Sequence, residues 1–86
     1  MPDLLWGFSL DDLDMVARTA ATRSRYAIAG EDRAHRYEMA WSAAALHLAE
    51  VDRAPTKYEL IGAGLDAIVA ESRLRAAASL APAEGS

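Results

Sequence analysis

Apolar residues recur at spacings of three and four along most of the chain, and turn residues divide this pattern into three segments. Such spacing places apolar side chains on one face of an α-helix. We therefore predict helices over about residues 10–28, 32–51 and 57–75. We find no strand pattern and no internal repeat, so the predicted fold is all-α, a compact three-helix bundle.

The first predicted helix has a clear start. Ser9 is the expected N-cap, and Asp11 and Asp12 follow in the first turn, where they oppose the positive end of the helix dipole. Gly30 is a residue type that accepts the left-handed conformation after a helix, so we expect the helix to reach Tyr26 or Ala29. The predicted buried stripe is Leu10, Leu13, Val16, Ala17, Ala20 and Ala21.

The second predicted helix is the most apolar and is expected to be central. It starts near Glu31 or Asp32 and is followed by only a short connection over residues 52–55. Because the connection is short, the second and third helices should be close neighbours that meet at an angle. The predicted buried stripe is Tyr37, Ala40, Trp41, Ala44, Leu48 and Val51.

The third predicted helix follows Pro55 and begins with a capping box, formed by Thr56 and Glu59. Its apolar positions are Leu60, Ile61, Leu65, Ile68 and Val69. Gly62 and Gly64 interrupt this run, and each costs about 1 kcal/mol relative to alanine inside a helix. We expect a close-packed neighbouring helix, within the chain or across a dimer, to offset that cost. The alternative is a helix that bends or lies against a partner's backbone.

The 86 residues fit one small domain over residues 1–78, followed by a flexible tail at 79–86. A hydrophobic fraction of 52% with 26% charged residues is typical of a globular chain and not of a disordered one. Because much of the apolar fraction is alanine, large core side chains are few. A dimer that completes the core is therefore one expectation.

Several classes of protein are disfavoured by composition. The chain has no cysteine, which excludes disulfides, thiolate catalysis and Cys-type zinc sites. No apolar run approaches the roughly 20 residues of a membrane span. Met1-Pro2-Asp3 lacks the positive region of a signal peptide, so we expect a cytoplasmic protein without membrane contact.

No group of residues has the spacing that catalysis needs. His35 and His47 are twelve residues apart on one helix and do not form a metal-binding pair. Asp11, Asp12 and Asp14 could suggest Mg²⁺ ligands, but at a helix start such residues act far more often as cap and dipole residues. We expect no enzyme activity, no metal, no cofactor and no small-molecule substrate.

The formal net charge of −4 argues against a strongly basic nucleic-acid binder. The basic residues are nevertheless clustered, because one window holds Arg18, Arg23, Arg25, Arg33 and Arg36. Lys57 is the only lysine. The window is either a solvated turn region paired with local acids, or a cationic patch for phosphates or for an acidic protein surface.

An apolar segment precedes the first helix, with Leu4, Leu5 and Trp6 in succession. A large aromatic side chain at this place has little to pack against unless it folds back or meets a partner. Together with the glycine-lined face at Gly62 and Gly64, this segment forms the predicted partner interface.

Two short motifs resemble bacterial transcription proteins. Residues 53–60 (Arg-Ala-Pro-Thr-Lys-Tyr-Glu-Leu), followed by Gly64, resemble the "PT..EL...G" entry into helix-turn-helix domains. Residues 59–68 resemble the "DLIQEG..GL" signature in the region 2 helices of sigma-70-type factors. Residues 32–43 are similar to segments of small sigma-like or helix-turn-helix proteins of actinobacteria and their phages.

The resemblance implies a non-catalytic, transcription-associated module that docks on RNA polymerase or DNA. The contacts would come from Lys57, the arginine window and the Thr56–Asp66 helix face. The chain departs from both patterns, because Gly62-Ala63 replaces the Gln-Glu pair that would face the polymerase, and no basic recognition helix follows Gly64. The alternative is a protein-interaction module, a homodimer, adaptor or inhibitor that binds through apolar helix faces.

Overall fold

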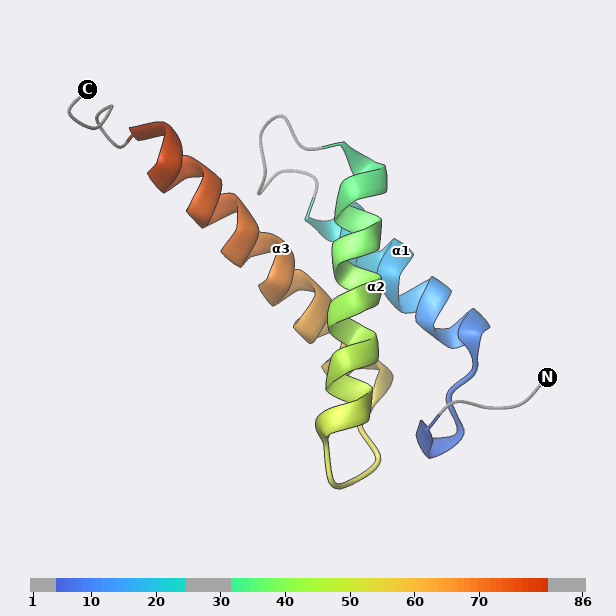
Figure 1. Ribbon diagram of the computed structural model, residues 1–86. Helices are drawn as coiled ribbons and strands as arrows, with labels where there is room; N and C mark the ends of the chain where they lie inside the picture. Colours follow the sequence, from blue (N-terminus) through green and yellow to red (C-terminus); the bar gives the residue numbers. More distant parts are fainter. Residues whose placement is uncertain (1–4, 25–31, 81–86) are drawn as a thin grey trace.

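The computed structural model describes residues 5–24 and 32–80 (Figure 1). Within these residues the chain forms a short 3₁₀ turn, η1 (Leu5–Gly7), and the helices α1 (Leu10–Arg23), α2 (Arg33–Glu50) and α3 (Lys57–Leu80). The described part contains no strand. The predicted all-α, three-helix fold is therefore confirmed.

A capping box begins α1, as the residue types at its start require. The Ser9 Oγ accepts a hydrogen bond from the backbone N–H of Asp12 at 3.2 Å, and the Asp12 carboxylate accepts one from the N–H of Ser9 at 2.9 Å. Two otherwise unpaired donors of the first turn are thereby satisfied. The predicted N-cap at Ser9 is confirmed.

Within the described residues, α1 ends at Arg23. Ser24 is its C-cap, and the Ser24 hydroxyl donates to the carbonyl of Ala21 at 3.1 Å. A serine that bonds back to the preceding turn competes with continuation of the helix. The predicted end at Tyr26 or Ala29 and the proposed stop at Gly30 lie outside the described residues.

The other two helices begin where expected. Asp32 caps α2 by accepting from the N–H of His35 at 2.8 Å, and Thr56 Oγ1 accepts from the N–H of Glu59 at the start of α3. α3 continues to Leu80, beyond the predicted end near residue 75 and into the first two residues of the predicted tail. The rest of that tail, residues 81–86, lies outside the described residues.

The three helices enclose one hydrophobic core. α2 makes the most extensive contacts with both of the others, which confirms its central place. The buried cluster consists of Leu13, Val16, Ala17, Ala20, Ala40, Ala44, Leu48, Leu60, Ile61 and Ile68. Phe8, Tyr37, Met39, Trp41, Ala45 and Leu65 pack against its edge. The predicted stripes thus supply most of the core. The exceptions are Leu10, which is 44% exposed, and Val51 and Val69, which are partly buried outside the cluster.

The helices approach one another most closely at Gly64. A Cβ atom at this position would lie 3.0 Å from the Cβ of Ala40 on α2 and 3.2 Å from the Cβ of Ala20 on α1. Gly64 is therefore the point where all three helices meet, and the expected close neighbour is within the chain. Gly62 differs, because a Cβ there would have nothing within 4 Å, and no contact in the structure explains this glycine.

Among the described residues, no helix is both long and apolar enough to cross a membrane.

Alanine substitutions at the two glycines should have opposite effects on stability. Gly64→Ala forces a methyl group against Ala20 and Ala40, and we expect the free energy of unfolding to fall by about 1–3 kcal/mol. Gly62→Ala adds a methyl group in open space and removes backbone freedom from the unfolded chain, so we expect a gain of about 0.5–1 kcal/mol. Urea unfolding followed by circular dichroism measures both. Equal effects of the two substitutions would contradict the three-helix contact at Gly64.

Candidate functional site

Four of the six predicted basic contact residues lie around the exposed side of α1. Arg18 and Arg23 belong to α1 itself and are exposed. Arg33, at the start of α2, donates from Nη2 to Thr22 Oγ1 at 3.3 Å, and Lys57, at the start of α3, places its Nζ 4.0 Å from the Sδ of Met15. We call Arg18, Arg23, Arg33 and Lys57 the basic face.

The basic face also contains shallow depressions. One is lined by Arg18, Thr19, Thr22 and Arg23, so guanidinium groups and hydroxyls border the same surface. A second, between α1 and α2, is lined by Asp14, Arg18, Arg33, Ala34 and Tyr37. Guanidinium and hydroxyl groups are hydrogen-bond donors suited to carboxylate or phosphate oxygens.

One acid is built into this surface. Asp14 accepts from the hydroxyl of Tyr37 at 2.6 Å and pairs with Arg18 Nε at 3.0 Å. The hydrogen bond that Tyr37 donates to Asp14 raises the pKa of Tyr37, because loss of the proton would place two negative charges together. Arg18 is thus partly neutralised, whereas no acid pairs with Arg23 or Arg33 in the described residues.

Arg36 does not belong to the basic face. It is only 6% exposed, and its Nε donates to the carbonyl of Ala21 at 3.1 Å. That carbonyl lies in the last turn of α1 and also accepts from the Ser24 hydroxyl, and a cation there opposes the negative end of the helix dipole. The prediction of Arg36 as a contact residue is corrected to a structural role. Arg25 lies outside the described residues.

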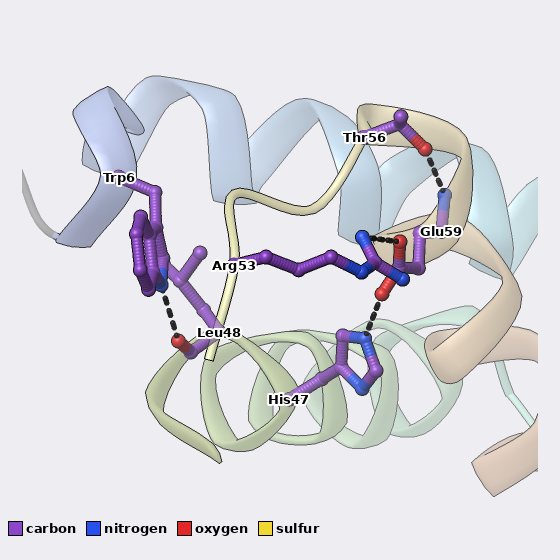
Figure 2. A network of polar contacts seen from close by, with 6 residues as sticks. All are labelled: Trp6, His47, Leu48, Arg53, Thr56 and Glu59. Atoms are coloured by element: carbon purple, nitrogen blue, oxygen red, sulfur yellow. Dashed lines mark hydrogen bonds and ion pairs between the residues drawn. The ribbon is translucent and has the colours of Figure 1, made fainter. Parts of the chain in front are cut away.

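The predicted interface at the N-terminus is partly folded onto the bundle. The indole Nε1 of Trp6 donates to the carbonyl of Leu48 at 3.2 Å, near the end of α2 (Figure 2). This bond holds Trp6 in a left-handed conformation, with φ of 61°, which costs about 1–2 kcal/mol for a non-glycine residue. Trp6 still exposes 44% of its surface and Leu5 53%. Leu4 lies outside the described residues.

The two predicted interface glycines lie in different surroundings. Gly64 is buried at the crossing of the three helices and is unavailable to a partner. Gly62 has open space beside it. The glycine-lined face therefore keeps only Gly62 as an accessible member.

A polar cluster joins the end of α2 to the start of α3. The Glu59 carboxylate lies 2.7 Å from His47 Nε2 and 3.1 Å from Arg53 Nη1, between the two side chains (Figure 2). Since a carboxylate only accepts, His47 Nε2 must carry the hydrogen. The predicted capping box is therefore half formed, because Thr56 accepts from Glu59 N–H while the Glu59 side chain turns to His47 and Arg53.

A second cluster of the same composition joins the other ends of these helices. Glu71 pairs with His35 Nε2 at 3.7 Å and with Arg75 Nε at 2.9 Å. The two histidines of α2 and the two glutamates of α3 are each twelve residues apart, and the helices run in opposite directions. Each histidine thus meets a glutamate, which the spacing of the histidines alone could not reveal.

Within the described residues, no group of three or more His, Cys, Asp or Glu side chains could hold a metal ion. Asp12 serves the α1 cap and Asp14 binds Tyr37 and Arg18, so two of the three clustered aspartates have structural partners.

Comparison with known proteins gives no relative, because no protein family, no curated protein and no solved structure matches the chain.

Acid should weaken the α2–α3 connection. The hydrogen bond from His47, with a smaller part from Arg53, lowers the pKa of Glu59, and the one from Arg75, with a smaller part from His35, lowers the pKa of Glu71. Both carboxylates then stabilise the fold at pH values above the ordinary glutamate pKa of about 4.3, and this stabilisation is lost as the pH falls through the lower pKa of the folded state. Urea unfolding between pH 7 and pH 3 measures this effect. On acidification, the double variant Glu59→Gln/Glu71→Gln should lose less of its free energy of unfolding than the wild-type protein loses.

Glu38→Gln is the control, because Glu38 is an exposed glutamate of α2 that takes part in neither cluster. Its pH profile should follow that of the wild-type protein. A double variant that loses stability in acid as steeply as the wild type would contradict the assignment.

A substitution at Arg36 should separate its structural role from a contact role. Arg36→Met leaves the carbonyl of Ala21 without its guanidinium donor, and we expect a loss of about 1–3 kcal/mol in the free energy of unfolding. Arg18→Met removes only an exposed ion pair and should change stability by less than about 1 kcal/mol. Chemical denaturation of both variants measures the difference, and equal losses would contradict the assigned role.

Proposed function

We propose that this protein is a small non-catalytic module that docks on the transcription machinery through the basic face of α1. The observation that carries the proposal is the gathering of Arg18, Arg23, Arg33 and Lys57, from three helices, around one exposed helix. Arg18 and Lys57 are 39 positions apart in the sequence and belong to different helices, α1 and α3. They border the same surface only because the helices pack together.

Electrostatics favours a protein surface over DNA as the partner. The formal net charge of −4 repels a polyanion at long range, and Asp14 partly neutralises Arg18 within the basic face. Arg23 and Arg33 retain donors for carboxylates, which an acidic protein surface supplies. RNA polymerase is therefore the leading partner, and duplex DNA is the alternative that the same experiment tests.

The sequence resemblance supports the class of partner and not the contact residues. In the sigma-like run at residues 59–68, Leu60, Ile61, Gly64 and Ile68 are buried. α3 also continues without a turn past Gly64, so the described residues contain no second helix of a helix-turn-helix motif after Thr56. We therefore propose α1, and not the Thr56–Asp66 helix face, as the docking surface.

Binding should depend on the two unneutralised arginines. The double variant Arg23→Ala/Arg33→Ala loses two charge-assisted donors, and we expect its affinity for purified RNA polymerase to fall about tenfold or more. Fluorescence anisotropy of labelled protein measures this affinity, and the same titration with duplex DNA at low salt tests the alternative.

The matched control is Ala49→Glu/Ala54→Glu. It lowers the net charge by the same amount at exposed positions away from α1, and it should bind like the wild type. Absence of binding to both polymerase and DNA would overturn the proposal, as would equal losses in the arginine and control variants.

A second candidate function is protein–protein interaction through apolar surface. Several large apolar side chains are exposed, and they are Leu5, Trp6, Leu10, Met15, Leu46, Tyr58 and Leu74. Two of them, Leu46 at 59% and Leu74 at 69% exposure, lie on the α2–α3 side of the bundle. Apolar side chains exposed to this degree on neighbouring elements are typical of interaction surfaces.

A further inference from the structure

A groove on the α2–α3 side of the bundle is largely apolar. Met39, Ala43 and Leu46 of α2 and Ala67 of α3 line it together with the polar residues His35, Glu38 and Ser42 of α2, and no residue of α1 contributes. The groove therefore lies apart from the basic face. Leu46 exposes more than half of its surface there, so the described chain leaves this apolar side chain uncovered.

α3 carries an apolar stripe that begins beside the groove and continues beyond it. Its members are Ala63, Ala67, Ala70, Leu74 and Ala77, at alternating spacings of four and three; the first two are partly buried and the last three are exposed. This is the heptad spacing with which one helix packs along another. The C-terminal part of α3 projects past α1 and α2, and residues 73–78 are all exposed (Figure 1). Leu74, at 69% exposure, is the largest side chain of this projecting part.

We propose that the occupant of this surface is a second copy of the chain, with the two α3 helices antiparallel and the Leu74 of each copy seated over the other's groove. The inference rests on the second candidate function and not on the basic face. Leu74 is one heptad beyond Ala67, which corresponds to about 10.5 Å along a helix. A two-fold axis midway between them brings each Leu74 to the partner's Ala67, so one arrangement fills both grooves.

Charge supports both the self-pairing and its direction. Asp66 and Arg73 flank the stripe on the same side, one heptad apart, and neither has a hydrogen-bond or ion-pair partner among the described residues. An antiparallel pair places Asp66 of each copy opposite Arg73 of the other, which forms two ion pairs by symmetry. A parallel pair would instead place Asp66 near Glu71, and two acids would repel each other.

Charge reversal across the symmetry axis tests the proposal. Sedimentation velocity of the full chain between about 10 and 500 µM should show a monomer–dimer equilibrium in the range of weak self-association. Asp66→Arg and Arg73→Asp each place like charges opposite one another twice, and we expect the dimer dissociation constant to rise about tenfold or more. The double variant Asp66→Arg/Arg73→Asp restores both pairs and should dimerise like the wild type.

Leu74→Glu tests the apolar contact separately and should abolish the dimer. Circular dichroism should show unchanged helix content for all these variants, because each substituted residue is exposed. Asp11→Arg, an exposed charge reversal on α1, is the matched control and should leave dimerisation unchanged. A wild-type chain that stays monomeric throughout this range, or a double variant no better than either single one, would overturn the proposal. Neither result affects polymerase binding, which is measured separately.

Discussion

The close approach of three helices at Gly64 is the constraint on which the rest of the structure depends. Gly64 faces Ala20 and Ala40 with no room for a further methyl group, so α1, α2 and α3 meet through their smallest side chains. Larger residues such as Leu13, Leu48, Leu60 and Ile68 then fill the space around this contact. Small side chains at a crossing shorten the distance between helix axes. An alanine-rich chain can therefore enclose a core with few large side chains.

The sequence allowed the helices and most of the core to be predicted, because periodicity and capping are local properties. Ser9, Asp32 and Thr56 begin helices through side chains that act within three residues. Ser24, the C-cap of α1, is a residue type that can either continue a helix or end one, and here its hydroxyl donates to the preceding turn.

The candidate site was only partly predictable, because burial of a charged or polar side chain depends on tertiary structure. Arg36 looks like its neighbour Arg33 in sequence, yet it reaches the open end of α1, while Arg33 stays on the surface. Trp6 reaches the open end of α2 in the same way. Helix ends leave carbonyl groups unpaired, and a donor distant in sequence can satisfy them only once the helices have packed. Lys57 likewise lies near the arginines of the basic face only because helix packing brings the start of α3 next to α1.

The pairing of charges determines which surfaces are left for partners. Two glutamates of α3 form ion pairs with His35, His47, Arg53 and Arg75. On one side of the α2–α3 pair, polar groups therefore hold the helices together. The two clusters join α2 and α3 at His47–Glu59 and at His35–Glu71. Some exposed charged side chains that have no ion-pair partner among the described residues lie on two separate surfaces. Arg23 is on α1, and Asp66 and Arg73 are on the outer side of α3. The cationic surface and the self-complementary surface that we propose are therefore separate, because the ion pairs among the described residues include neither Arg23 nor Asp66 and Arg73.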